Sequence, residues 1–193
     1  MIIKNIDLKF ILILLLTTIS CENNLSVKEQ FFYKRYKNDS LVGYTVRNFI
    51  TKKDTLKERI FYLDNKYQII DSSQRKIFLI KKEKLNIIYK RRQINSPYAS
   101  FKKKGAVTHS TDLLFGKVET IYKGKYNFYE FKDLYKLHIN FLEIDGYGPD
   151  GNIYLDKNFR LIGKDSISVF MPFDKEIKVD KNEIPNDLLI EFD

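Results

Sequence analysis

From Lys28 onward, apolar residues recur at every second position in short runs that are separated by polar turns. Successive side chains of a β-strand point to opposite faces, so this period of two is typical of strands with one buried face. No stretch keeps the 3.6-residue period of an amphipathic helix for three turns. The pattern predicts an all-β, mainly antiparallel fold in which about ten strands form a single curved sheet or a half-open barrel, with at most short helices.

The composition favours the same fold class. The chain contains 13 Tyr and 15 Phe but only 8 Gly and 4 Pro, and aromatic and β-branched side chains suit a half-buried pleated surface. We expect residues 28–193 to form a single β-rich domain. Cys21 is the only cysteine. The chain therefore cannot form an internal disulfide or a thiolate zinc cluster, and its folded domain offers no cysteine nucleophile.

The regular pattern is interrupted in two places. Between residues 91 and 117 it gives way to polar, small and basic residues, which predicts a long irregular segment with a turn of helix near residues 111–115. After Pro172 we expect the chain to leave the sheet, with a short helical turn within residues 182–189.

Two nine-residue segments match each other position by position in residue class. They are residues 62–70 and residues 154–162, and each places an Asp after an apolar strand end and an aromatic residue three positions later. An Asp side chain can accept hydrogen bonds from the backbone of the turn that follows it. The repeat predicts the same hairpin twice.

The chain begins with a pattern typical of a secretion signal. Lys4 and Lys9 precede the apolar residues 10–16, and small residues follow at 17–20, directly before Cys21. A membrane-spanning helix needs about 20 apolar residues, and this run is shorter. We therefore expect residues 1–20 to be removed.

Cys21 directly after Ser20 resembles the lipobox of bacterial lipoproteins, although Thr18 stands where that family typically has Leu. The resemblance implies a diacylglyceryl group on the sulfur of Cys21, acylation of the new amine and residues 21–27 as a lipidated tether. Two or more acyl chains hold a protein firmly on a bilayer. Glu22 replaces the Asp that signals inner-membrane retention in the family, so we expect an outer-membrane location; the periplasmic and surface faces both remain open. The alternative is an ordinary secreted protein with an unmodified Cys21.

The repeated hairpins of a helix-poor envelope protein are also similar in pattern to the half-open barrels of envelope lipid and lipoprotein carriers. This likeness covers the two hairpins and assigns a role to no residue.

No motif indicates catalysis, a metal or a cofactor. His109 and His138 are the only histidines, and His138 has the alternation of an exposed strand position. The loop at residues 145–153 lacks the ligand spacing of a calcium loop, and no Gly-x-Ser-x-Gly sequence is present. We expect no enzymatic activity and no cofactor.

The formal net charge is +9, and three basic clusters stand out as a candidate patch. They comprise Lys81, Lys82, Lys84, Lys90, Arg91, Arg92, Lys102, Lys103 and Lys104. Such a patch fits an anionic membrane surface, while solvated strand ends are the alternative interpretation. We expect no nucleic-acid partner, because a lipid-anchored envelope protein rarely meets one.

Two functions follow from these expectations. The first is a non-enzymatic envelope lipoprotein that binds an apolar ligand or an envelope component on its curved sheet. The second is an interaction module, an assembly factor or an inhibitor, that holds a protein partner through a basic rim or a sheet edge. An envelope hydrolase ranks behind both because it would need clustered carboxylates or histidine in a cleft.

Overall fold

A computed structural model of the protein describes residues 26–73, 76–89, 94–112, 116–142, 151–165, 173–185 and 188. The described chain forms thirteen strands and one short 3-10 helix. The strands are β1 (Val27–Lys37), β2 (Ser40–Lys52), β3 (Thr55–Leu63), β4 (Ile69–Ser72), β5 (Lys76–Lys81), β6 (Lys84–Tyr89), β7 (Ile94–Ser100), β8 (Val107–Asp112), β9 (Gly116–Phe128), β10 (Phe131–Phe141), β11 (Gly151–Leu155), β12 (Leu161–Asp165) and β13 (Lys175–Val179), and the helix is η3 (Lys181–Glu183).

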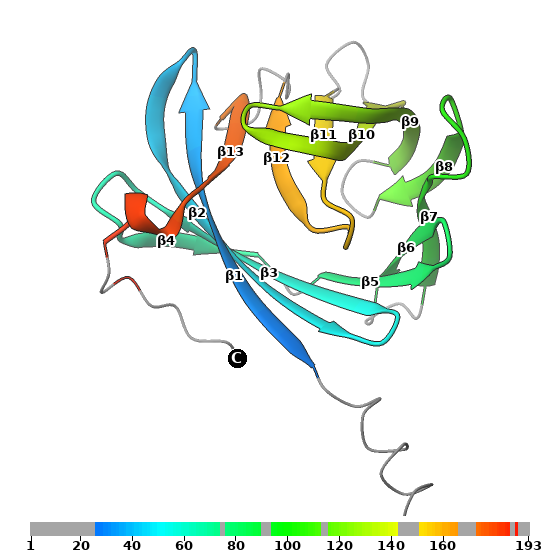
Figure 1. Ribbon diagram of the computed structural model, residues 1–193, viewed down its shortest axis with the longest axis horizontal. Helices are drawn as coiled ribbons and strands as arrows, with labels where there is room; N and C mark the ends of the chain where they lie inside the picture. The colour runs from blue at the N-terminus through cyan, green and yellow to red at the C-terminus, as the bar shows by residue number, and fades with distance from the viewer. Residues whose placement is uncertain are drawn as a thin grey trace, which may run out of the picture.

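All thirteen strands belong to one antiparallel sheet. The order along it is β7-β6-β5-β3-β2-β1-β13-β12-β11-β10-β9-β8, with β4 paired to β3 beside this path. The two ends of the path, β7 and β8, lie against each other, so the sheet curls into a nearly closed barrel, and Figure 1 looks into its ring of strands. The prediction of an all-β, antiparallel, curved sheet is confirmed.

The core lies on both faces of the sheet. One cluster draws side chains from strands of both halves of the path, such as Phe31, Phe49, Leu85 and Leu137, and therefore fills the barrel interior. The second cluster comes from β1, β2, β3 and β13 only. Its members point to the opposite face, where Phe32 lies directly opposite Val46 and Val46 lies directly opposite Phe61.

The outer cluster is covered by the end of the described chain. Ile184, which follows η3, is 4% exposed within this cluster, and Leu188 packs against it together with Tyr67. Figure 1 shows this C-terminal part outside the ring of strands. Burial on both faces explains why residues 43–49 of β2 are all buried, so alternation alone does not tell which face of β2 is the interior.

The repeated hairpin is confirmed in detail. Asp64 Oδ1 accepts hydrogen bonds from the backbone N–H groups of Lys66 and Gln68 at 2.8 and 2.9 Å. The equivalent oxygen of Asp156 accepts from Asn158 and Arg160 at the same two distances. Tyr67 and Phe159, the equivalent aromatic residues, both have positive φ, 64° and 61°. The first hairpin joins β3 to β4 and the second joins β11 to β12.

Two sequence predictions about irregular segments are wrong. The segment 91–117 contains all of β7 and β8, and Thr111, predicted to start a helical turn, lies in β8. Both are the end strands of the sheet path, where polar residues and the Pro97 of β7 are tolerated because one edge has no ladder partner. Residues 113–115 lie outside the described part.

The chain also returns to the sheet after Pro172, contrary to expectation. β13 inserts between β1 and β12 and pairs with both, which raises the strand count above the predicted ten. The predicted helical turn is present as η3, slightly earlier than expected, with Asp180 as its N-cap. Within the described ranges, no helix has the length and apolar character needed to cross a bilayer.

Candidate binding site inside the barrel

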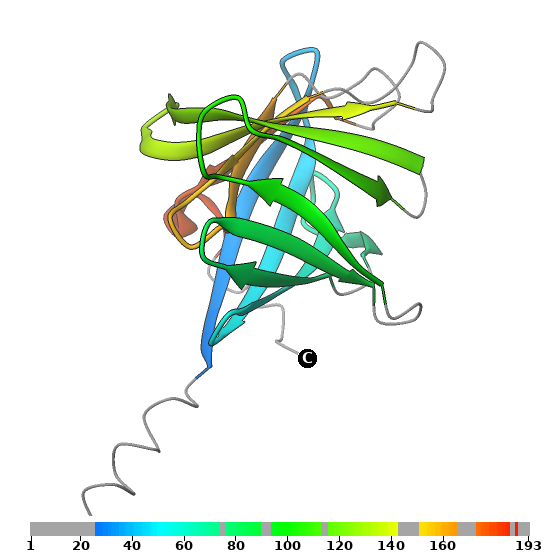
Figure 2. The same cartoon turned by 90° about the vertical axis from the view of Figure 1, so that its right-hand side faces the viewer.

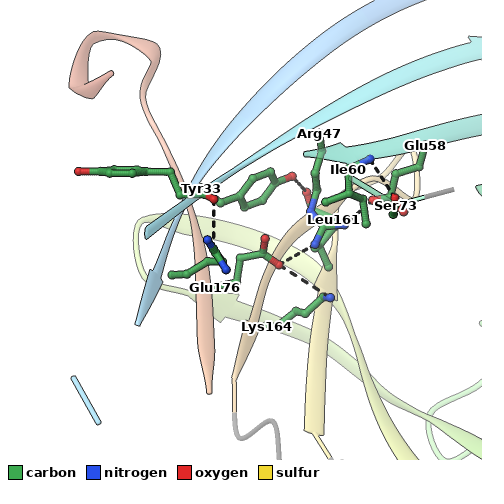
Figure 3. A network of polar contacts seen from close by, with 10 residues as sticks. Tyr33, Arg47, Glu58, Ile60, Ser73, Leu161, Lys164 and Glu176 are labelled. Carbon is green, nitrogen blue, oxygen red and sulfur yellow. Dashed lines mark hydrogen bonds and ion pairs between the residues drawn. The ribbon is translucent and has the colours of Figure 1, made fainter. Parts of the chain in front are cut away.

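A charged cluster lies inside the barrel, centred on Arg47 of β2. Its Nη1 donates to Glu58 Oε1 of β3 and its Nη2 donates to Glu176 Oε2 of β13, both at 2.6 Å. The side chains of Arg47 and Glu176 are 2% and 0% exposed. Figure 3 shows Arg47, Glu176 and Lys164 pointing toward one another. We call Arg47, Glu58, Lys164 and Glu176 the interior cluster.

The sheet register brings these side chains together. Glu176 of β13 lies directly opposite Lys164 of β12 on one side and opposite Arg35 of β1 on the other. Lys164 Nζ is 3.8 Å from Glu176 Oε2, the oxygen that Arg47 already binds. The cluster therefore exists only because β13 inserts beside β1 and places Glu176 within reach of β2.

Burial and neighbouring charges shift the pKa values of Glu176 and Lys164. Burial opposes ionisation of Glu176, but the charges of Arg47 and Lys164 and the hydrogen bond from Arg47 outweigh burial and hold its pKa below the usual value. Burial, assisted by the charge of Arg47, lowers the pKa of Lys164 to about 8. Glu176 is therefore a carboxylate at neutral pH, and Lys164 is the cation that most readily loses its charge.

The interior holds more positive than negative charge. Arg35, Arg47 and Lys164 face the two carboxylates Glu58 and Glu176. Arg35 is fixed by the backbone, because its Nε donates to the carbonyl oxygen of Tyr44 at 3.1 Å and its Nη2 donates to that of Leu63 at 2.6 Å. Arg47 is divided between two acids. The surplus charge therefore resides on Lys164.

Several fully buried polar atoms of this interior have no hydrogen-bond partner among the described residues. They are Arg47 Nε, Glu176 Oε1, Thr45 Oγ1 and Thr120 Oγ1. The Thr45 hydroxyl lies close enough to Glu176 to help lower the pKa of that acid, although the geometry falls short of a hydrogen bond. Buried polar atoms are nearly always satisfied by protein, water or ligand, so these atoms mark a place where a polar group is held.

Lys164 differs from its neighbours in accessibility. Its side chain is 23% exposed, whereas that of Glu176 is fully buried. Tyr33 closes the cluster on another side: its hydroxyl donates to the carbonyl oxygen of Leu161 at 2.5 Å, and its ring lies 5.3 Å from the Arg47 guanidinium carbon. Lys164 is therefore the least buried charged group of the interior cluster.

The rest of the interior is apolar and largely aromatic. Phe101, from the connection between β7 and β8, packs against Tyr122, Tyr135 and Phe159 with ring centroids 4.9–5.4 Å apart. Aliphatic side chains such as Leu137 belong to the same cluster. The barrel interior thus combines a polar zone with an apolar zone.

The predicted basic patch is brought together in part. Lys84 pairs with Ser100 across β6 and β7, and Phe101 N–H donates to the carbonyl oxygen of Glu83 at 2.8 Å. The lysines around the β5–β6 turn thus lie beside Lys102, Lys103 and Lys104. Lys90, Arg91 and Arg92 lie outside the described residues, as does Cys21.

The histidines take no part in the interior cluster. His138 of β10 is half-buried, and its Nδ1 lies 3.1 Å from Asn152 Oδ1 of β11. His109 is exposed on β8, opposite Glu119. Among the residues that the structure describes, no group of three or more His, Cys, Asp or Glu side chains is placed to hold a metal ion.

Sequence reasoning missed the interior cluster. A signal was present in the sequence. Arg47 shares one face of β2 with the apolar Phe49, and the other face, which carries Val46, is also apolar. A charged residue in a strand that is apolar on both faces must be buried with a partner. Neither a protein-family model, nor a curated protein, nor a solved structure matches this chain.

Proposed function

We propose that the protein is a lipid-anchored lipoprotein of the bacterial outer membrane whose barrel binds an amphipathic ligand with an anionic head group. The observation that carries the proposal is Lys164, the least buried member of the interior cluster, in which Arg47 Nε has no partner among the described residues and which lies beside a largely apolar interior. The anchor is inferred from the leader and from Cys21, and the barrel supplies the binding element.

The charge of the interior selects the head group. A molecule with a carboxylate or a phosphate would neutralise the surplus charge on Lys164 and accept a hydrogen bond from Arg47 Nε. A cationic head group would be repelled by Lys164. The apolar part of the ligand would lie against the aromatic and aliphatic side chains of the interior, where burial of each methylene contributes about 0.8 kcal/mol.

The test uses the mature chain with Cys21→Ser and a fluorescent fatty acid, parinaric acid, beside its uncharged methyl ester. We expect the acid to bind at least tenfold more tightly than the ester, because only the acid pairs with Lys164. Dodecyl phosphate should displace the probe if phosphate is accepted, whereas displacement by dodecanoate alone would restrict the site to carboxylates.

The variant Lys164→Met should bind the acid no more tightly than the ester, and its affinity for the ester should equal that of the unsubstituted chain. The matched control is Lys66→Met, which removes an exposed lysine from the β3–β4 turn and should leave both affinities unchanged. If neither probe binds, or if the acid and the ester bind the wild-type chain equally, the proposed function is wrong.

A second function is favoured by the ends of the sheet path. Within the described residues, β7 pairs only with β6 and β8 only with β9, so each has an edge outside the ladder. An extended segment of a protein partner could add to such an edge. Photo-crosslinkers placed at Asn95 and at Thr108 would capture such a partner in cells, and capture at neither position would exclude this function.

A further inference from the structure

The lysine-rich turns of the sheet gather at the end of the barrel where β1 begins. Val27 pairs with Thr51 beside the β2–β3 turn, and Ile80 N–H donates to the carbonyl oxygen of Asp54 in that turn at 2.6 Å. The β5–β6 turn is in turn joined to the β7–β8 connection through Phe101 and Glu83. Figure 2 shows the beginning of β1 and these three connections on the same side of the molecule.

One half of this end, formed by the β2–β3, β5–β6 and β7–β8 connections, is strongly basic, whereas the β9–β10 and β11–β12 turns at the same end carry both charges. The three connections carry eight exposed lysines and the acidic residues Asp54 and Glu83. We call the lysines the basic rim: Lys52, Lys53, Lys81, Lys82, Lys84, Lys102, Lys103 and Lys104. Within the described residues, none of these lysines forms an ion pair.

The opposite end of the barrel is balanced. Its described turns and strand ends carry five lysines and five aspartates: Lys37, Lys66, Lys76, Lys117 and Lys175, and Asp39, Asp64, Asp112, Asp165 and Asp174. Lys175 is paired with Asp39 at 2.8 Å. Among the described residues, the excess of lysine over acidic side chains therefore lies at the end where β1 begins.

The position of the proposed anchor gives the asymmetry a direction. Val27, 54% exposed, is the first residue of β1, and the six residue steps from Cys21 to Val27 span at most about 20 Å. A chain anchored at Cys21 therefore presents to the bilayer the end at which β1 begins. Charges attract an anionic surface within about one Debye length, about 8 Å at physiological salt, which a tether of this length allows.

We propose that the basic rim lies against the anionic phospholipid head groups of the membrane that carries the anchor. The proposal uses the lipid anchor of the proposed function to orient the barrel, but the affinity of the rim for lipid is a separate property. Each lysine near an anionic membrane contributes about 1 kcal/mol, so the rim would hold the barrel upright while the opposite end faces away from the bilayer.

The test measures vesicle binding without the anchor. The mature chain with Cys21→Ser is mixed with vesicles of phosphatidylcholine alone or of phosphatidylcholine with phosphatidylglycerol, and the bound fraction is measured by sedimentation. We expect binding to the anionic vesicles only, and release as salt is added. A rim variant, Lys82→Gln with Lys102→Gln and Lys103→Gln, should bind about a hundredfold more weakly, which corresponds to about fivefold for each lysine.

The matched control removes the same charge from the opposite end, with Lys37→Gln, Lys66→Gln and Lys117→Gln. It should bind anionic vesicles within a few-fold of the unsubstituted chain, and circular dichroism should show both triple variants folded. Equal losses in the two variants would mean that net charge alone drives binding and would overturn the proposal. Absence of binding to anionic vesicles would also overturn it and would favour an acidic protein as the partner of the rim.

The two proposals fail separately. If Cys21 carries no lipid but the rim still binds anionic vesicles more tightly than the control end, the anchor is wrong and the rim stands. If Cys21 is lipidated but the rim variant binds like the unsubstituted chain, the rim proposal is wrong and the anchor stands.

Discussion

At the scale of single residues, Arg47 is the side chain on which the interior depends. It lies in β2 and binds Glu58, eleven residues away, and Glu176, 129 residues away. Two carboxylates are buried beside it, and burial of an unpaired carboxylate is costly. Arg47 thus links the first three strands to the last one and allows both acids to remain charged inside the barrel.

Arg47→Met should destabilise the protein strongly. It leaves Glu58 and Glu176 buried without their shared cation, and removal of one partner from a buried ion pair costs about 3–5 kcal/mol. The free energy of unfolding, measured in urea at neutral pH, checks this. Lys57→Met, a half-buried position on the outer face of β3, is the control and should change stability by less than about 1 kcal/mol.

The same argument predicts a rescue. Adding Glu58→Gln and Glu176→Gln to Arg47→Met removes the uncompensated charges, so the triple variant should recover part of the lost stability. A triple variant that is less stable than Arg47→Met alone would show that the carboxylates are not the source of the loss.

Lys164 should make the stability depend on pH in the alkaline range. Burial lowers its pKa to about 8 in the folded protein, against 10.5 for an ordinary lysine. Between these values the unfolded chain binds more protons than the folded one, so the contribution of this residue to stability rises as the pH increases from 8 to 10.5. Across this range, the free energy of unfolding of the wild type should therefore rise relative to that of Lys164→Met.

The measurement is a series of urea unfolding curves for the two proteins at pH values between 7 and 11. Taking the difference cancels the contribution to the pH dependence of the tyrosines whose pKa values burial raises, because both chains contain these tyrosines. A constant difference across the series would contradict the lowered pKa of Lys164.

At the scale of elements, the repeated hairpin shows how local chemistry determines local structure. In both copies, one Asp oxygen accepts from two backbone N–H groups, and an aromatic residue adopts a positive φ. The two copies lie in different halves of the sheet path. They fold alike because the turn is stabilised by its own residues.

Asp64→Ala should destabilise the β3–β4 hairpin. It removes the acceptor of two backbone hydrogen bonds, each of which contributes about 0.5–1.5 kcal/mol, so we expect a loss of about 1–3 kcal/mol in the free energy of unfolding. Asp64→Asn retains an acceptor oxygen and should lose much less. If the Asn and Ala variants are equally unstable, the charge of Asp64 and not its acceptor geometry supports the turn.

At the scale of the whole molecule, β13 decides the architecture. β13 joins β1 to β12, and without it the sheet would fall into two separate meanders. The same strand supplies Glu176 to the interior cluster. The end of the barrel where β1 begins carries the basic rim.

Cys21→Ala should abolish membrane attachment of the full-length chain. In the host cell, labelling with a palmitate analogue should mark the wild-type protein and not the variant, because the thioether sulfur is lost. The amino terminus of the wild-type protein, read by mass spectrometry, should be a modified Cys21. A wild-type protein that retains residues 1–20, or that begins at another residue, would disprove the lipoprotein assignment.

The sequence by itself determined what depends on neighbouring residues. The period-two alternation showed the strands, because side-chain direction alternates within each strand whatever it pairs with. The Asp-centred turns were also predicted, because hydrogen bonds among their own neighbouring residues stabilise them. The basic clusters were visible in the sequence as a candidate patch, but the placement of Lys84 beside Lys102–Lys104 follows from the pairing of β6 with β7, which the sequence did not predict.

Only the tertiary structure decided which face of each strand is the interior and which charges meet there. β7, β8 and β13 were missed because polar end strands and a short strand after an irregular segment lack the apolar signal, and their pairing depends on distant partners. Arg47 and Glu176 are separated by 129 residues, and nothing local to either predicts their contact. The pairing of β13 with β1 brings them together, and that pairing joins segments from opposite ends of the described chain.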